Sequence, residues 1–218
     1  MIKAVIFDMD GTLFDTEQLV LRGWRALVEE GSAPAVLLEL APKWRGRNRS
    51  EIKKQIQAVL EPSRSADDLY QRRNEIMRGM LDREGVPLKE GVPEIFPVLQ
   101  QMGLRLALAT ASSVETVSDY MARTGYGCYF ERIVTGSRVP NGKPAPDIFL
   151  LAAEELGLAP SECVVVEDSP NGVRAGIAAG MKTVMVPDLD QPDEDIRRGL
   201  WHLCRTLREL PPLMEKEI

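Results

Sequence analysis

Histidine is almost missing from this sequence of 218 residues, which contains a single example, His202. Triads and metal sites built on several histidines are therefore not expected, and acid–base chemistry would fall to carboxylates. Cysteine is also scarce. Cys128, Cys163 and Cys204 are odd in number and widely spaced, which fits neither a disulfide framework nor a zinc motif. The composition therefore indicates a protein of the reduced cytosol.

Long apolar runs and an excess of positive charge are missing too. No run approaches the roughly 20 residues of a membrane helix, and no charged leader followed by an apolar segment opens the sequence. We therefore expect a cytoplasmic protein without a membrane partner. The formal net charge of −6 argues against nucleic acid as the main partner, because phosphate backbones attract basic surfaces. A local basic pocket could still bind a small anion.

Short apolar runs, most of them rich in β-branched residues, are typical of buried parallel strands. Helix-period segments separate them, so the sequence predicts an α/β fold with a parallel, Rossmann-like sheet flanked by helices. The expected strands are Ala4–Phe7, Leu104–Ala109, Ile133–Val134, Cys163–Val166 and Thr183–Val186. Glycines at helical spacing predict close packing of one helix on this sheet: Gly172, Gly176 and Gly180.

The alternation of strands and helices stops between about residues 19 and 90. Three helix-period segments follow one another there, at Glu17–Glu30, Ser50–Leu60 and Ala66–Glu84, without a strand-like run between them. Turn residues at Gly85-Val86-Pro87 mark the exit. The sequence therefore predicts an α/β core domain of residues 1–16 and 90–218, with an inserted all-helical domain of residues 17–89.

Carboxylates follow two of the expected strands. Asp8 and Asp10 end the first, and Glu167 and Asp168 end the fourth. The carboxyl ends of parallel strands border the ligand crevice of such sheets. Two carboxylates about 4 Å apart repel by about 4 kcal/mol at an effective dielectric constant of 20. A bound cation would relieve this repulsion, and an all-oxygen set without histidine favours Mg²⁺ over zinc or copper. A turn followed by a helix cap is the alternative interpretation of the first pair.

Two further positions can bind a phosphate group. Thr110 ends the second expected strand, where its hydroxyl could hold a phosphoryl oxygen, whereas Ser112 or Ser113 could simply cap the next helix. Lys143 lies between a turn and Pro144, so its backbone is restricted, which favours a functional role over a solvated surface charge.

These segments together resemble the four ordered motifs of the haloacid dehalogenase superfamily. The matching residues are Asp8-x-Asp10-Gly11-Thr12, Thr110, Lys143-Pro144-x-Pro146-Asp147 and Glu167-Asp168-Ser169. The match spans nearly the whole sequence. A helical domain directly after the first motif resembles the β-phosphoglucomutase-like branch, in which this domain is a cap. The resemblance implies a phosphoryl-transfer enzyme with a helical cap domain at residues 17–89.

The resemblance also implies roles for the acidic residues. Asp8 would attack phosphorus and form an aspartyl-phosphate, and Asp10 would protonate the leaving oxygen and then accept a proton from water. Mg²⁺ would be held by Asp8, by the backbone carbonyl of Asp10 and by Asp168. Glu167 would contribute less directly to the metal site.

The same resemblance implies which residues bind the substrate. Thr110 and Lys143 would hold phosphoryl oxygens as charge develops on them. The helical domain would select the substrate, because its basic segment 44–50 resembles the specificity loop of this branch. The expected substrate-binding residues are Thr110, Ala111, Ser112, Lys143, Arg45, Gly46, Arg49 and Arg73.

Two departures from the branch bear on the reaction. β-Phosphoglucomutases carry a histidine where Val20 stands and Lys-Asn where Ser113-Val114 stands. Both differences remove polar partners for a second phosphate, so we expect a phosphatase acting on a sugar phosphate or a nucleoside monophosphate. A phosphosugar mutase is the alternative, and an inactive binding protein on the same scaffold is a remote one. The expected partner is a small phosphorylated metabolite, and the expected state is a monomer.

Overall fold

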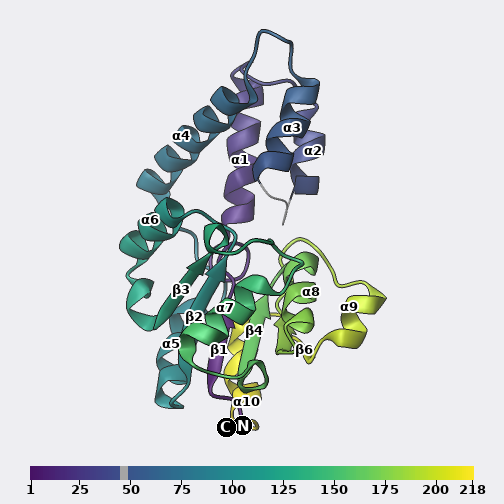
Figure 1. The fold of residues 1–218 in the computed structure, drawn as a ribbon. Helices are drawn as coiled ribbons and strands as arrows, with labels where there is room; N and C mark the ends of the chain where they lie inside the picture. The colour runs from purple at the N-terminus through teal and green to yellow at the C-terminus, as the bar shows by residue number, and fades with distance from the viewer. Residues whose placement is uncertain (45–48) are drawn as a thin grey trace. The chain divides into compact units, whose positions relative to one another are not determined.

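The computed structural model describes residues 1–44 and 49–218 and divides the chain into two compact units. One unit comprises residues 1–14 and 88–218, and the other comprises residues 15–87. The first carries the sheet and the second is helical (Figure 1). The sequence placed the junctions after residues 16 and 89, two residues further along the chain in each case.

The α/β unit is built on a six-stranded, fully parallel sheet with the order β3-β2-β1-β4-β5-β6. The predicted class, a parallel Rossmann-like sheet flanked by helices, is confirmed. The strands are β1 (Ala4–Phe7), β2 (Arg105–Thr110), β3 (Arg132–Thr135), β4 (Cys163–Glu167), β5 (Lys182–Met185) and β6 (His202–Leu203). The edge strand β6, which consists of two exposed residues, was not foreseen from the sequence.

The central strand β1 consists only of buried apolar residues, because both of its faces are covered and both of its edges are paired. Phe7 lies opposite Leu108 of β2 and Val166 of β4. In this register β4 ends one residue beyond the partner of Phe7, at Glu167, and β2 ends two residues beyond it, at Thr110. The residues that follow the three strands in the sequence therefore emerge at the same edge of the sheet.

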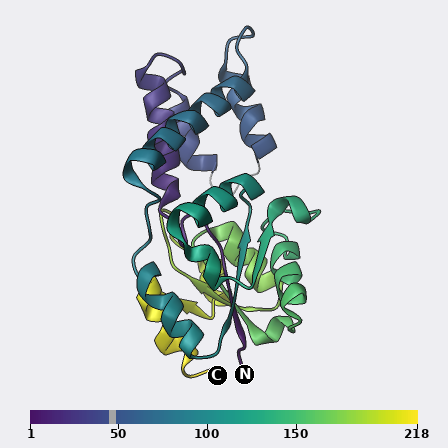
Figure 2. The ribbon, with the colours of Figure 1, turned by 90° about the vertical axis from the view of Figure 1, so that its left-hand side faces the viewer.

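Helices cover both faces of the sheet (Figures 1 and 2). Ile6 packs in a cluster with Phe149 on one face, whereas the ring of Phe7 lies 5.5 Å from that of Phe96 on the other. The α-helices of this unit are α5 (Val92–Gln101), α6 (Val114–Thr124), α7 (Asp147–Leu156), α8 (Pro170–Ala178), α9 (Glu194–Gly199) and α10 (Leu210–Met214). Short 3₁₀ turns are η2 (Tyr126–Tyr129), η3 (Gly136–Arg138), η4 (Pro160–Glu162) and η5 (Leu207–Glu209). Among the described residues, every helix is too short or too polar to cross a bilayer.

The helical unit packs around a cluster of aromatic rings. Trp24 lies edge-on to Trp44 at 5.6 Å and to Tyr70 at 6.2 Å, and the indole N–H of Trp44 donates a hydrogen bond of 2.7 Å to Gln55. The helices are α1 (Thr16–Glu29), α2 (Leu37–Leu40), η1 (Ala41–Trp44), α3 (Arg49–Val59) and α4 (Ala66–Glu84). The three long helices expected from the sequence are present, and the short α2 and η1 were not foreseen.

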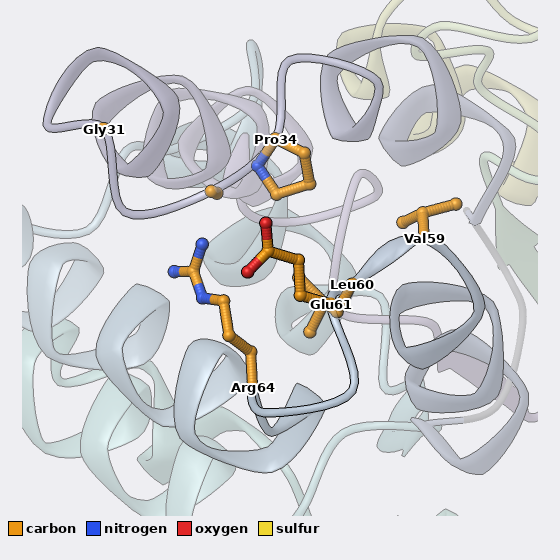
Figure 3. Close-up of a pocket in the computed structure, with 7 residues that line it drawn as sticks. Gly31, Pro34, Val59, Leu60, Glu61 and Arg64 are labelled. Atoms are coloured by element: carbon orange, nitrogen blue, oxygen red, sulfur yellow. The ribbon is translucent and has the colours of Figure 1, made fainter.

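A pocket of about 220 Å³ opens in the helical unit (Figure 3). Apolar side chains form part of its wall, and the charged ends of Glu61 and Arg64 face it. The Arg64 guanidinium donates a hydrogen bond to the carbonyl oxygen of Ser32. The lining residues are Gly31, Ala33, Pro34, Val59, Leu60, Glu61 and Arg64, and none of them is a predicted site residue.

Candidate functional site

The carboxylate of Asp8 lies at the carboxyl end of the central strand. Its backbone N–H donates a hydrogen bond of 3.0 Å to the carbonyl oxygen of Val166, which fixes the backbone of the residue directly after β1. Asp8 is only 7% exposed. Burial raises the pKa of Asp8 to about 8, against the effect of the Lys143 ammonium, which lowers that pKa. Burial therefore disfavours the ionised form of Asp8, and a nearby positive charge favours it.

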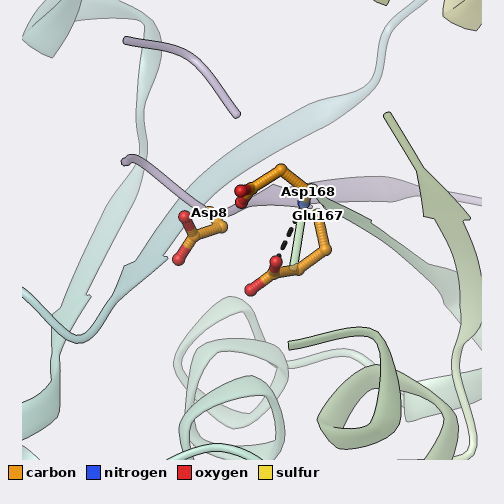
Figure 4. A group of neighbouring side chains, drawn as sticks. All are labelled: Asp8, Glu167 and Asp168. Atoms are coloured by element: carbon orange, nitrogen blue, oxygen red, sulfur yellow. Dashed lines mark hydrogen bonds between the residues drawn. The ribbon is translucent and has the colours of Figure 1, made fainter. Parts of the chain in front are cut away.

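Three buried carboxylates gather at this edge of the sheet (Figure 4). Asp8 follows β1, Glu167 ends β4 and Asp168 follows it, and one oxygen from each lies within 4.8 Å of the other two. The register of β1 and β4 produces this arrangement, because Phe7 pairs with Val166 and the next residues, Asp8 and Glu167, therefore lie side by side.

Lys143 supplies positive charge to this cluster. Its buried ammonium donates hydrogen bonds to Asp8, to Glu167 at 2.7 Å and to the carbonyl oxygen of Ala109 at 3.2 Å. Burial alone would lower the pKa of Lys143, but the two carboxylates outweigh burial and raise that pKa above its usual value. Lys143 is therefore held in its charged form between two strand ends.

The Glu167 carboxylate is held by hydrogen bonds from the loop that follows it. Its Oε2 atom accepts hydrogen bonds from the backbone N–H groups of Asp168 and Ser169, both at 2.9 Å, and from the Ser169 hydroxyl at 3.0 Å. Its Oε1 atom accepts from Lys143. A Cβ atom on Gly172 would lie 1.7 Å from Oε1, so only glycine leaves room for this carboxylate at the start of α8. Both oxygens of Glu167 are thus already engaged by the protein.

The loop after β1 wraps around Asp168. The Thr12 hydroxyl donates a hydrogen bond of 3.1 Å to Oδ1 of Asp168. Gly11 has a φ of +82°, and a Cβ atom there would lie 2.3 Å from Oδ2. The Gly11-Thr12 pair therefore fixes the direction of the Asp168 carboxylate from both sides.

Asp10 contacts the loop after β2. The Ser112 hydroxyl donates a hydrogen bond of 2.5 Å to Oδ2 of Asp10, and the Ser112 backbone N–H donates one of 3.0 Å to the Thr110 hydroxyl. Ser113 caps α6 by accepting a hydrogen bond from the backbone N–H of Thr116. The helix-cap interpretation thus holds for Ser113, and Ser112 instead contacts an acidic residue.

The structure brings the predicted core residues together. The core set at the carboxyl end of the sheet comprises Asp8, Asp10, Thr110, Ala111, Ser112, Lys143, Glu167 and Asp168. Arg45 and Gly46 lie outside the described residues, as does the side chain of Arg49 at the start of α3. Arg73 is buried in the helical unit, with its guanidinium 4.1 Å from the centre of the Tyr70 ring.

Neither a role of the Thr12 hydroxyl nor the contact between Ser112 and Asp10 was foreseen from the sequence. The one available signal for Thr12 was its place in the Asp-Gly-Thr run after the first strand. The contact of Ser112 with Asp10 spans 102 positions in the sequence, so no local pattern could have indicated it.

The donor set fits a divalent cation. Asp8, Glu167 and Asp168 carry three negative charges when ionised, and Lys143 carries one positive charge, which leaves two negative charges to be balanced. All the donors are oxygens, which suits Mg²⁺ or Ca²⁺ and disfavours softer metals. The site can therefore hold a divalent cation beside a buried carboxylate and an ammonium, an arrangement suited to stabilising the charge of a phosphate group.

Known proteins of similar sequence include phosphatases. The family model of the haloacid dehalogenase-like hydrolases matches residues 2–180. The fructose-1-phosphate phosphatase YqaB of Escherichia coli strain K12 is 35% identical over 189 residues, covering 84% of this chain and 95% of that protein. A phosphorylated carbohydrates phosphatase of Thermotoga maritima is 33% identical over 182 residues, covering 84% and 83%. The fold is also that of a β-phosphoglucomutase from Clostridium difficile, with a TM-score of 0.78, 21% identity and coverage of 100% and 96%.

Proposed function

The chain belongs to the haloacid dehalogenase-like hydrolase family and is a phosphoric monoester hydrolase, and from this premise we propose that it is a Mg²⁺-dependent phosphatase of small sugar phosphates. The reaction proceeds through an aspartyl-phosphate on Asp8. One observation carries the proposal: the buried Asp8 carboxylate lies beside the Lys143 ammonium and the carboxylates that follow β4.

Asp8 acts as the nucleophile. One of its carboxylate oxygens forms a bond to phosphorus while the bond from phosphorus to the ester oxygen breaks, and the leaving oxygen takes a proton from the carboxyl group of Asp10. The products of this step are the free alcohol and the aspartyl-phosphate. Lys143 stabilises the charge on the transferring group, because it already bridges Asp8 and Glu167 without reorganisation.

Water then releases the phosphate. The Asp10 carboxylate accepts a proton from the attacking water as its oxygen bonds to phosphorus and the bond to Asp8 breaks. Asp10 is protonated again and Asp8 is free, so one ester and one water have become one alcohol and one phosphate. Thr110, at the end of β2, and the adjacent backbone of Ala111 hold phosphoryl oxygens in both steps.

The side chains of Asp8 and Asp168 and the backbone carbonyl of Asp10 would hold the Mg²⁺ ion. Bound there, the ion supplies positive charge that neutralises the phosphate oxygens and keeps Asp8 ionised. Glu167 supports the site without ligating the metal, because its two oxygens are engaged by Lys143 and by the loop that follows β4. Thr12 and Gly11 orient Asp168.

Sugar phosphates are the favoured substrates because two similar proteins are named as phosphatases of fructose 1-phosphate and of phosphorylated carbohydrates. Arg45 and Arg49 in the cap are proposed to contact the sugar, as the sequence suggested. A phosphosugar mutase is the second candidate function, because a solved Thermotoga maritima structure named as a β-phosphoglucomutase is 29% identical to this chain, with a TM-score of 0.82. Val20 and Ser113-Val114 disfavour the mutase, since they replace the histidine and the Lys-Asn pair of that branch.

A panel of phosphate esters tests this function. Purified enzyme with Mg²⁺ should release phosphate from hexose phosphates faster than from nucleoside monophosphates. Asp8→Asn should lower kcat/KM by at least about 10³-fold, because an amide cannot replace the nucleophile. Asp195→Asn, an exposed acid on α9, is the matched control and should retain wild-type activity.

Two results would contradict the proposal. Turnover by Asp8→Asn within tenfold of wild type would exclude the covalent mechanism. Efficient conversion of β-glucose 1-phosphate to glucose 6-phosphate with a bisphosphate primer, and with little phosphate release, would establish the mutase instead.

A further inference from the structure

The loop that carries Ser112 is held from several directions. Thr110 pairs with Thr135 of β3, and its hydroxyl accepts a hydrogen bond from the backbone N–H of Ser112. Gly136 passes so close beneath that a Cβ atom on it would lie 3.3 Å from both the Cα and the carbonyl oxygen of Ala111. Ser113 then caps α6. The backbone of Ser112 is therefore set by its neighbours on both sides.

The side chain of Ser112 is directed at an acid. Its hydroxyl oxygen lies 2.5 Å from Oδ2 of Asp10, within the range of a strong, charge-assisted hydrogen bond. A serine hydroxyl has a single proton to donate, and here that proton is directed to Asp10. The loop after β2 thus reaches the loop after β1 through this contact.

We propose that Ser112 is a positioning residue for Asp10 and that the enzyme depends on it for substrates whose leaving group needs a proton. This inference rests on the proposed function, in which Asp10 protonates the leaving oxygen. It differs from the role that the sequence suggested for Ser112, a contact with the substrate phosphate. The Ser112 hydroxyl holds the Asp10 carboxyl where it can reach that oxygen, and it does not itself touch the reacting atoms.

The consequence depends on the leaving group. An alcohol oxygen of a sugar leaves poorly without a proton, so transfer from a sugar phosphate needs a well-placed Asp10. A 4-nitrophenolate ion is a far weaker base and leaves without protonation. The hydrolysis of the aspartyl-phosphate is the same for both substrates, because the leaving group has departed by then, and it needs Asp10 to accept the proton of water.

Two kinetic constants separate these steps. The value of kcat/KM reports the reaction up to the departure of the leaving group, whereas kcat also includes hydrolysis of the aspartyl-phosphate. In Ser112→Ala, kcat/KM for fructose 1-phosphate should fall by about 10–100-fold, because a misplaced Asp10 carboxyl transfers its proton less efficiently. For 4-nitrophenyl phosphate, kcat/KM should stay within about threefold, while kcat falls and a burst of nitrophenolate precedes the steady state.

Matched variants complete the test. Ser112→Thr keeps a hydroxyl and should restore most of kcat/KM on fructose 1-phosphate. Ser113→Ala removes the neighbouring hydroxyl, which caps α6 and contacts no acidic residue that we assign to the reaction, and should leave both substrates near wild type.

Three outcomes would overturn the inference. Equal losses of kcat/KM on both substrates would show that Ser112 contacts the phosphate. Unchanged constants in Ser112→Ala would show that it has no role. The same loss in Ser113→Ala as in Ser112→Ala would show a general effect of the loop. A wild-type enzyme that released phosphate from neither ester would instead refute the proposed function, which is a separate result.

Discussion

Lys143 and Glu167 form a buried ion pair in which the ammonium lies 2.7 Å from Oε1 of the carboxylate. The same ammonium also contacts Asp8. Lys143 follows a turn after β3 and precedes α7, whereas Glu167 ends β4, so the pair joins parts of the chain that are 24 positions apart. Lys143 therefore balances part of the negative charge that Asp8 and Glu167 bring to the site.

Replacing Lys143 by methionine should therefore affect both activity and stability. Methionine has a similar length and no charge, so Asp8 and Glu167 would remain buried without compensation. We expect the free energy of unfolding to fall by about 3–5 kcal/mol, the cost of breaking a buried pair, and kcat to fall at least about 10²-fold. Urea unfolding and steady-state kinetics measure the two effects.

Lys3→Met is the control for that variant. Lys3 pairs with Glu162 in an exposed ion pair, and such pairs contribute at most about 1 kcal/mol. A Lys143→Met enzyme as stable and as active as Lys3→Met would refute the central role given to this ammonium.

Gly172 and Gly176 lie one turn apart on α8 and should respond differently to alanine. A Cβ atom on Gly172 would meet Oε1 of Glu167 at 1.7 Å, whereas one on Gly176 would meet the Thr183 hydroxyl at 2.6 Å, away from the carboxylates. Both variants should be destabilised by about 1–3 kcal/mol through overpacking.

Activity distinguishes the two glycine variants. Only Gly172→Ala should lose kcat/KM, by at least about tenfold, because only that substitution displaces Glu167. The measurement is made at a temperature where both variants are folded, as judged by circular dichroism. Equal activity of the two alanine variants would contradict the supporting role of Glu167.

The predicted packing of the three glycines is only partly correct. Helical spacing of Gly172, Gly176 and Gly180 predicted close packing of a helix on the sheet, and this is confirmed for Gly176, which lies against Thr183 and Val165. It is wrong for Gly180, which lies beyond α8 in a turn with a φ of +72° and has nothing within 4 Å of the position of a Cβ atom. Periodicity reports which face a residue occupies, but not where the helix ends.

The fold was predictable because long, strongly periodic segments dominate it. All five expected strands and the three long helices of the helical unit are present. The missed elements are short: β6 has two residues and α2 has four, so each contains only about one period of its pattern, too little to be recognised. The hydrogen bonds of Thr12 to Asp168 and of Ser112 to Asp10 span 156 and 102 positions and arise only from the sheet order.

Mg²⁺ should stabilise the protein as well as activate it. A ligand at 100 times its dissociation constant adds about 2.7 kcal/mol to the free energy of unfolding. For a chain of this size, that amount raises Tm by about 5–10 °C. Asp168→Asn should lose most of this shift, while the exposed Asp195→Asn should keep it.

The measurement is thermal unfolding with and without Mg²⁺, made alongside phosphate release in excess chelator. Chelation should abolish turnover, and added Mg²⁺ should restore it. Full activity in chelator, or an undiminished thermal shift in Asp168→Asn, would argue against metal binding by Asp168.

Arg73 should stabilise the helical unit by packing, whereas the sequence predicted that it contacts the substrate. Only 7% of Arg73 is exposed, and its guanidinium lies 4.1 Å from the centre of the Tyr70 ring and 5.1 Å from that of Trp24. Stacking of this kind and the packing of the arginine stem together contribute about 1–3 kcal/mol. Arg73→Ala should lower the free energy of unfolding by that amount, whereas Arg72→Ala, on the exposed side of the same helix, should leave it nearly unchanged. Both variants should keep wild-type kcat/KM on fructose 1-phosphate and on 4-nitrophenyl phosphate while folded. If Arg73→Ala instead keeps its stability and loses kcat/KM on fructose 1-phosphate alone, then Arg73 contacts the sugar, because a packing residue has no reason to distinguish the two esters.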